Sequence, residues 1–74
     1  MHEIEEYQIS YRPEDKAGVV HLHLKYDQAA EIHVESPEEM SLILNILINE
    51  KPVYYDKQHG LLYTGYEKPG DNEG

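Results

Sequence analysis

The sequence contains no cysteine, phenylalanine or tryptophan, and only 6 of its 74 residues are lysine or arginine, against 15 aspartates and glutamates. Without cysteine the chain has no disulfide, no thiolate metal ligand and no cysteine nucleophile, which excludes a disulfide-stabilised secreted scaffold. The formal net charge is −9. Because so few cations are present to contact phosphate, we expect no direct binding to nucleic acid and no binding to an anionic membrane.

Long apolar runs are also missing. The longest uninterrupted runs hold three residues, as in 42–44, whereas about 20 are needed to cross a bilayer. The first residues have neither the basic nor the apolar segment of a signal peptide, so we expect a cytoplasmic protein. A domain of this size buries only about 60% of the surface of its unfolded chain. We therefore expect a thin core and no deep catalytic cavity.

The first half of the chain alternates between apolar and polar residues with a period of two, as strands with one buried face do. The alternation occurs in three segments, 7–11, 19–24 and 31–35, which are separated by turn-forming residues. We interpret the segments as an antiparallel meander. Glu3, Glu5 and Glu6 precede the first segment, and we assign them to a frayed N-terminus.

Ser36, Pro37 and Glu39 predict the start of a helix. Serine accepts a hydrogen bond from an early helical N–H, proline suits the first helical position, and Glu39 completes a capping box. The predicted helix runs from Pro37 to about Glu50 and ends before Pro52. Helical periodicity groups its apolar side chains into one broad stripe that suits packing on a sheet: Met40, Ile43, Leu44, Leu47 and Ile48.

A β-hairpin is predicted after Pro52, with strands at 53–55 and 61–64 and a turn at 56–60 that contains aspartate and glycine. The element order is therefore β-β-β-α-β-β. We predict one small α+β domain over residues 1–66, in which an apolar helix packs on one face of a mostly antiparallel sheet. Residues 67–74 hold no apolar side chain, and we interpret them as a disordered acidic tail.

Three histidines define a candidate metal site. His21 and His23 occupy the polar face of their strand, and His33 shares that face if the neighbouring strands pair through their apolar sides. A three-residue loop places His33 opposite His23, and a slip of two residues places it opposite His21. Such a cluster suits Zn²⁺ or another divalent metal. Solvent-exposed histidines without a specific metal are the alternative, and no other cofactor is expected.

Surplus apolar surface points to a protein partner or to a second copy of the chain. Leu42 and Ile46 lie outside the helical stripe, and tyrosine, which favours interfaces, is concentrated in the hairpin. The predicted interaction surface is Leu42, Ile46, Tyr54, Tyr55 and Tyr63. We expect cross-strand pairs of Val53 with Tyr63 and of Tyr55 with Leu61. The alternative is that the hairpin covers the helix within the monomer.

The sequence shows no glycine-rich phosphate loop, no nucleophile elbow and no zinc-protease motif, so we do not expect an enzyme. The function that we expect is a small, non-catalytic, self-associating protein-interaction module. One alternative is an acidic mimic of DNA that inhibits a nucleic-acid-binding protein, because the chain is both small and acidic. The other is divalent-metal binding by His21, His23 and His33.

Overall fold

The computed structural model describes residues 2–66, 68 and 69. It is a small α+β domain in which five antiparallel strands form one sheet in the order β3-β2-β1-β4-β5, with one helix. The elements follow the predicted order: β1 (His2–Arg12), β2 (Ala17–Leu24), β3 (Gln28–Val34), α1 (Pro37–Asn49), β4 (Val53–Asp56) and β5 (Leu61–Thr64). The prediction of a disordered tail concerns mainly residues 67 and 70–74, which lie outside the described residues.

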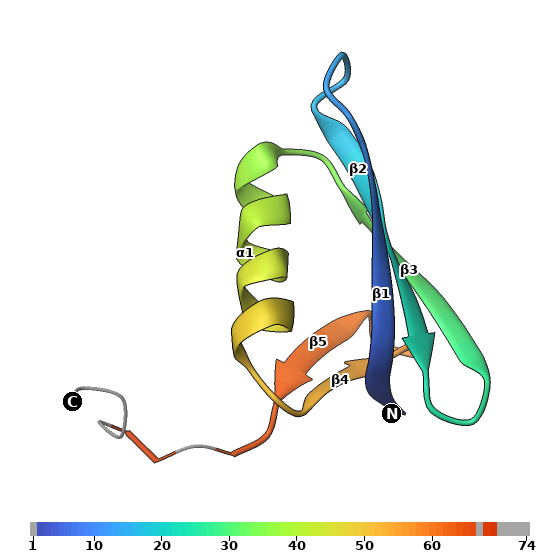
Figure 1. Ribbon diagram of the computed structural model, residues 1–74, viewed down its shortest axis with the longest axis vertical. Helices are drawn as coiled ribbons and strands as arrows, with labels where there is room; N and C mark the ends of the chain where they lie inside the picture. The colour runs from blue at the N-terminus through green and yellow to red at the C-terminus, as the bar shows by residue number, and fades with distance from the viewer. Residues whose placement is uncertain (1, 67, 70–74) are drawn as a thin grey trace.

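β1 is the central strand, and it is longer than the sequence indicated. It pairs with β2 from Ile4 to Arg12 and with β4 only at His2 and Glu3 (Figure 1). The prediction of a frayed N-terminus at residues 3, 5 and 6 was therefore wrong. The chain is held there by β4, by a backbone bond from Lys25 N–H to the Glu3 carbonyl at 3.0 Å, and by the Lys25–Glu3 ion pair at 3.0 Å.

A β-bulge at Glu5 changes which residues of β1 face the helix. Ile4 pairs with Leu24 and Glu6 pairs with His23, so β1 contains one more residue than β2 over this step. An extra residue shifts the alternation of side chains by one position. Ile4 before the bulge and Tyr7 after it therefore point to the same side of the sheet.

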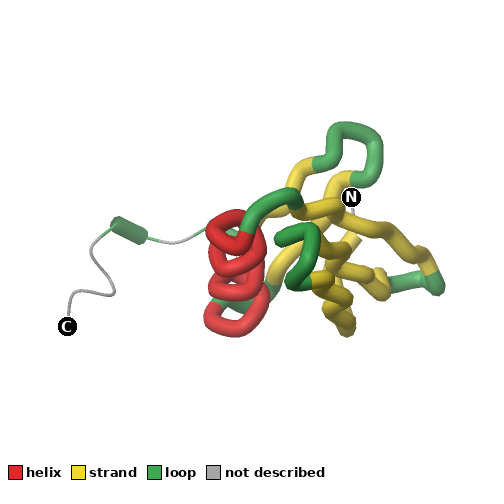
Figure 2. The backbone as a smooth tube through the Cα atoms, turned by 90° about the horizontal axis from the view of Figure 1, so that it is seen from above, coloured by secondary structure: helices red, strands yellow, loops and turns green. Residues whose placement is uncertain are grey.

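α1 covers one face of the sheet, and no described residue forms a helix on the opposite face (Figure 2). The core between them is small. Its most deeply buried side chains are Val20, Leu24 and Val34, all with 1% exposure or less. Met40 and Ile43 from the helix and Tyr55 from β4 belong to the same cluster. α1, the sole helix of the described residues, is not long and apolar enough to cross a membrane.

The helix begins where the capping residues predict. The Glu39 N–H donates to Ser36 Oγ at 3.1 Å, and the Glu39 carboxylate accepts from the N–H of Glu35, also at 3.1 Å. In the usual capping box that carboxylate returns to the capping residue itself, whereas here it bonds one residue earlier. The helix ends at Asn49, and the Glu50 N–H donates to the Ile46 carbonyl at 3.0 Å.

The helical stripe is only partly covered. Met40 and Ile43 are buried and Leu44 and Leu47 are half-buried, but Ile48 is 66% exposed although the periodicity predicted that it would pack on the sheet. Ile48 lies on the flank of α1 that faces Tyr11 of β1. β4 pairs with β1 only at His2 and Glu3, the first residues of β1, so the sheet does not extend beneath this flank of the helix.

Candidate interaction groove and polar sheet face

The three candidate metal ligands share the sheet face opposite the helix, as predicted, but in a different register. Leu24 pairs with Gln28, so His33 faces Val19 and Glu31 faces His21. Both predicted registers, with His33 opposite His23 or His21, were therefore wrong. The cause is the tight β2–β3 turn, in which Tyr26 and Asp27 adopt positive φ of 64° and 57°. This turn starts β3 three residues earlier than the polar pattern suggested.

Each of these imidazoles has a carboxylate beside it. The Glu31 carboxylate is 3.2 Å from His21 Nδ1 and 3.6 Å from His33 Nε2. His23 is instead beside Glu6, with Nδ1 3.3 Å from Oε1. No group of three or more histidine, aspartate or glutamate side chains in the described chain is placed to hold a metal ion. The polar face is thus a network of exposed imidazole–carboxylate contacts.

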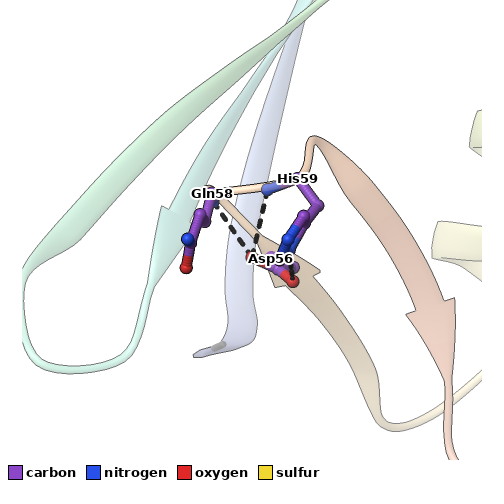
Figure 3. Close-up of polar contacts among 3 residues, drawn as sticks. All are labelled: Asp56, Gln58 and His59. Atoms are coloured by element: carbon purple, nitrogen blue, oxygen red, sulfur yellow. Dashed lines mark hydrogen bonds and ion pairs between the residues drawn. The ribbon is translucent and has the colours of Figure 1, made fainter.

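The other acid–imidazole contact stabilises the β4–β5 turn (Figure 3). Asp56 Oδ1 accepts from the backbone N–H groups of Gln58 and His59 at 3.0 and 3.3 Å, and Oδ2 lies 2.8 Å from His59 Nδ1. The hydrogen bond from His59 holds the pKa of Asp56 below its ordinary value. Gly60 then leaves the turn with φ of 63°. These contacts explain the turn and require no catalytic role.

The predicted interaction residues do not form one surface. Leu42 is 62% exposed and Ile46 is half-buried, both on the helix. Tyr55 is a core residue with 9% exposure, so its assignment to the surface was wrong. Because side chains alternate along a strand, Tyr54 lies on the face opposite Tyr55. There it stacks on Tyr63 with ring centroids 5.5 Å apart.

The hairpin register explains this stack. Tyr54 pairs with Tyr63 and Val53 with Thr64, one residue away from the expected pairs of Val53 with Tyr63 and Tyr55 with Leu61. Asp56 belongs to the ladder and pairs with Leu61, which leaves a turn of residues 57–60. The sequence placed Asp56 inside the turn because aspartate favours turns, whereas its side chain caps the turn from the end of β4.

An apolar groove that the sequence did not reveal lies between α1 and β1. We call it the α1–β1 groove, and its walls include Tyr11 of β1 and Pro37, Met40, Leu44 and Ile48 of α1. Tyr7 and Ile9 lie on the same side of β1 as Tyr11. All three remain 38–40% exposed although they face the side of the sheet that the helix covers.

The groove lies beside an open strand edge. Beyond Glu3, no strand in the described part of the chain pairs with β1 on the side away from β2. Backbone groups along residues 5–12 of this edge are therefore available to a further strand. In the sequence, this strand is marked by the alternation of Tyr7, Ile9 and Tyr11. Whether these side chains are exposed depends on where β4 pairs with β1, which no local sequence pattern shows.

No family model, curated protein or solved structure matches the chain. The geometry of its surface is therefore the basis for the function proposed below.

Proposed function

We propose that the chain is a non-catalytic protein-interaction module that binds a partner through the α1–β1 groove and the open edge of β1. One observation carries this proposal: Tyr7, Ile9 and Tyr11 remain 38–40% exposed on a strand whose outer edge, over residues 5–12, pairs with no other described strand. An open edge beside exposed apolar side chains is the arrangement to which a partner adds a strand. The cytoplasmic location expected from the sequence belongs to the same proposal.

The free energy gained by burying the exposed apolar side chains indicates how a partner would bind. Full burial of a large apolar side chain is worth about 1.5–3 kcal/mol, so covering the exposed parts of Tyr7, Ile9, Tyr11 and Ile48 would contribute roughly 3–5 kcal/mol. Association costs about 4–15 kcal/mol in lost translational and rotational freedom. The side chains alone therefore offset at most the lower end of this cost, and backbone hydrogen bonds along β1 are needed as well.

The acidic surface supports the DNA-mimic alternative less well. The carboxylates of β1 are part of an ordered strand, and two of them already have partners: Glu3 lies 3.0 Å from Lys25 Nζ and Glu6 lies 3.3 Å from His23 Nδ1. Binding through the groove and edge is expected to persist at high ionic strength, whereas binding through carboxylates alone is lost as salt screens the charge.

A matched pair of helix variants tests the groove. Ile48 and Leu42 are similarly exposed, at 66% and 62%, but Ile48 borders the groove and Leu42 does not. Immobilised wild type, Ile48→Glu and Leu42→Glu are used to capture partners from native lysate at low and high salt. We expect Ile48→Glu to lose the partner and Leu42→Glu to retain it at both salt concentrations.

Circular dichroism of both variants controls for folding. Equal capture by Ile48→Glu and wild type would exclude the groove as the binding surface. Loss of all binding at high salt, including that of wild type, would favour the acidic mimic instead.

A further inference from the structure

The open edge of β1 is complementary to itself. Its residues 6–12 read Glu-Tyr-Gln-Ile-Ser-Tyr-Arg, with Ile9 at the centre. An antiparallel copy centred on Ile9 places Tyr7 opposite Tyr11, Gln8 opposite Ser10 and Glu6 opposite Arg12. Each apolar side chain then meets an apolar one, each neutral polar side chain meets another, and each charge meets the opposite charge.

We infer that the partner bound at the groove is a second copy of this chain, paired antiparallel through the β1 edges with Ile9 opposite Ile9. This inference rests on the proposed function and names its partner. The two-fold axis of such a pair is perpendicular to the sheet, so both helices lie on the same face. Tyr7, Ile9 and Tyr11 of each copy then lie between the two helices, where both grooves join.

The charges select this register over its neighbours. Opposite charges directly across a strand pair stabilise it, and like charges destabilise it. Because β1 ends at Arg12, centring the pair on Ser10 would shorten it to residues 8–12 and place Arg12 opposite Gln8. Centring it on Gln8 would place Arg12 opposite Ile4, so both neighbouring registers lose the pairs between Glu6 and Arg12. A slip of one residue would turn the tyrosines of one copy to the other face of the sheet.

Glu6 and Arg12 can exchange their present contacts for a contact with each other across the dimer. The Glu6 side chain is 78% exposed and lies 3.3 Å from His23, and the Arg12 side chain is 72% exposed and lies 3.5 Å from Asp15. Exposed ion pairs of this kind contribute little to stability. Replacing them with an intermolecular Glu6–Arg12 pair therefore costs little.

The open edge of β1 is bounded on both sides of the proposed pairing. β4 occupies the edge of β1 at His2 and Glu3, and Pro13, which has no N–H to donate, follows Arg12. The edge of β3 is a poorer candidate because its inward side chains are already covered. Val34 is buried and Ile32 is half-buried, so a strand added there would cover little new apolar surface.

Sedimentation equilibrium of charge-swapped variants tests the inference. Wild type is compared with Arg12→Glu, with the double variant Glu6→Arg/Arg12→Glu, and with Lys57→Glu, which makes the same change in net charge in the β4–β5 turn. We expect wild type to sediment at twice its 8.6 kDa monomer mass. Arg12→Glu places a second carboxylate opposite Glu6 at two positions in each dimer and should weaken association roughly tenfold or more.

The double variant should restore the wild-type dissociation constant because it reverses both charges of each pair, and Lys57→Glu should change it by less than about threefold. Failure of the double variant to dimerise while its circular dichroism matches wild type would overturn the register. A wild-type monomer at about 0.1 mM, a concentration well above a micromolar dissociation constant, would overturn self-association. In that case, selective loss of a different partner by Ile48→Glu would still support the proposed function.

Discussion

Gly18 is the position where a single methyl group should most disturb the sheet. It lies in β2 between Tyr11 of β1 and Val34 of β3. A Cβ at this position would overlap the backbone carbonyl oxygen of Ser10 and would lie 3.0 Å from Met40 Cε. The Met40 side chain is flexible and can move, but the Ser10 carbonyl belongs to a paired strand. Gly18→Ala therefore has to push β1 away from β2.

The expected loss of stability follows from the clash with the backbone. Overpacking a core typically costs about 1–3 kcal/mol, and because the clash is with backbone we expect about 2–3 kcal/mol, at the upper end of that range. A domain of 74 residues is expected to have a free energy of unfolding of about 4–11 kcal/mol. Gly18→Ala should thus remove a large share of it and lower Tm by about 10–20 °C.

Urea unfolding followed by far-ultraviolet circular dichroism measures the effect, at one fixed protein concentration because self-association would stabilise the folded state. Gly65→Ala is the matched control, since its Cβ would meet only Pro52, with Cδ at 3.6 Å, an ordinary contact. We expect the control to remain within about 0.5 kcal/mol of wild type. A Gly18→Ala protein as stable as the control would refute the reasoning.

Three further predictions concern the helix cap, pH and salt. Ser36→Ala should lower the free energy of unfolding by about 1 kcal/mol because Glu39 loses its cap acceptor, whereas Ser41→Ala on the exposed helix surface should not; equal effects would contradict the capping role. The pKa of Asp56 is lowered in the folded state, so the ionised side chain stabilises the fold at pH values above 3.8, the ordinary pKa of aspartate, and this stabilisation is lost as pH falls through the lower folded pKa. The free energies of unfolding of wild type and Asp56→Asn should therefore converge in acid. A constant difference down to the lowest pH would contradict this. Because each copy carries −9, raising salt from low to physiological strength should tighten self-association in sedimentation, and weaker association would show that attraction between charges dominates.

The features that could be predicted from the sequence are those decided by neighbouring residues. The helix start at Ser36 depends on contacts within four residues, and it lies where predicted. The strand segments also follow from local alternation. The registers of both hairpins differ from expectation because each register depends on the length of its turn. Positive φ at Tyr26 and Asp27 shortens the β2–β3 turn, and the Asp56 cap shortens the β4–β5 turn.

The candidate site was harder to predict because it depends on contacts between distant segments. Tyr55 and Tyr54 are adjacent and chemically identical, yet one is in the core and the other lies on the opposite face. Which of them is buried depends on the pairing of β4 with β1, a contact between the two ends of the domain. The same pairing stops at Glu3 and leaves the rest of the β1 edge open.

The bulge at Glu5 links the fold to the groove. Ile4 pairs with the buried Leu24, so without an extra residue the even-numbered positions of β1 would continue to face the helix. Glu6, Gln8 and Ser10 would then point toward α1, and the exposed tyrosines would join the histidines on the polar face. Because of the bulge, an N-terminal segment that anchors in the core through Ile4 also presents Tyr7 and Ile9 beside an open edge. The strand can therefore hold the domain together at one end and offer a surface for strand pairing at the other.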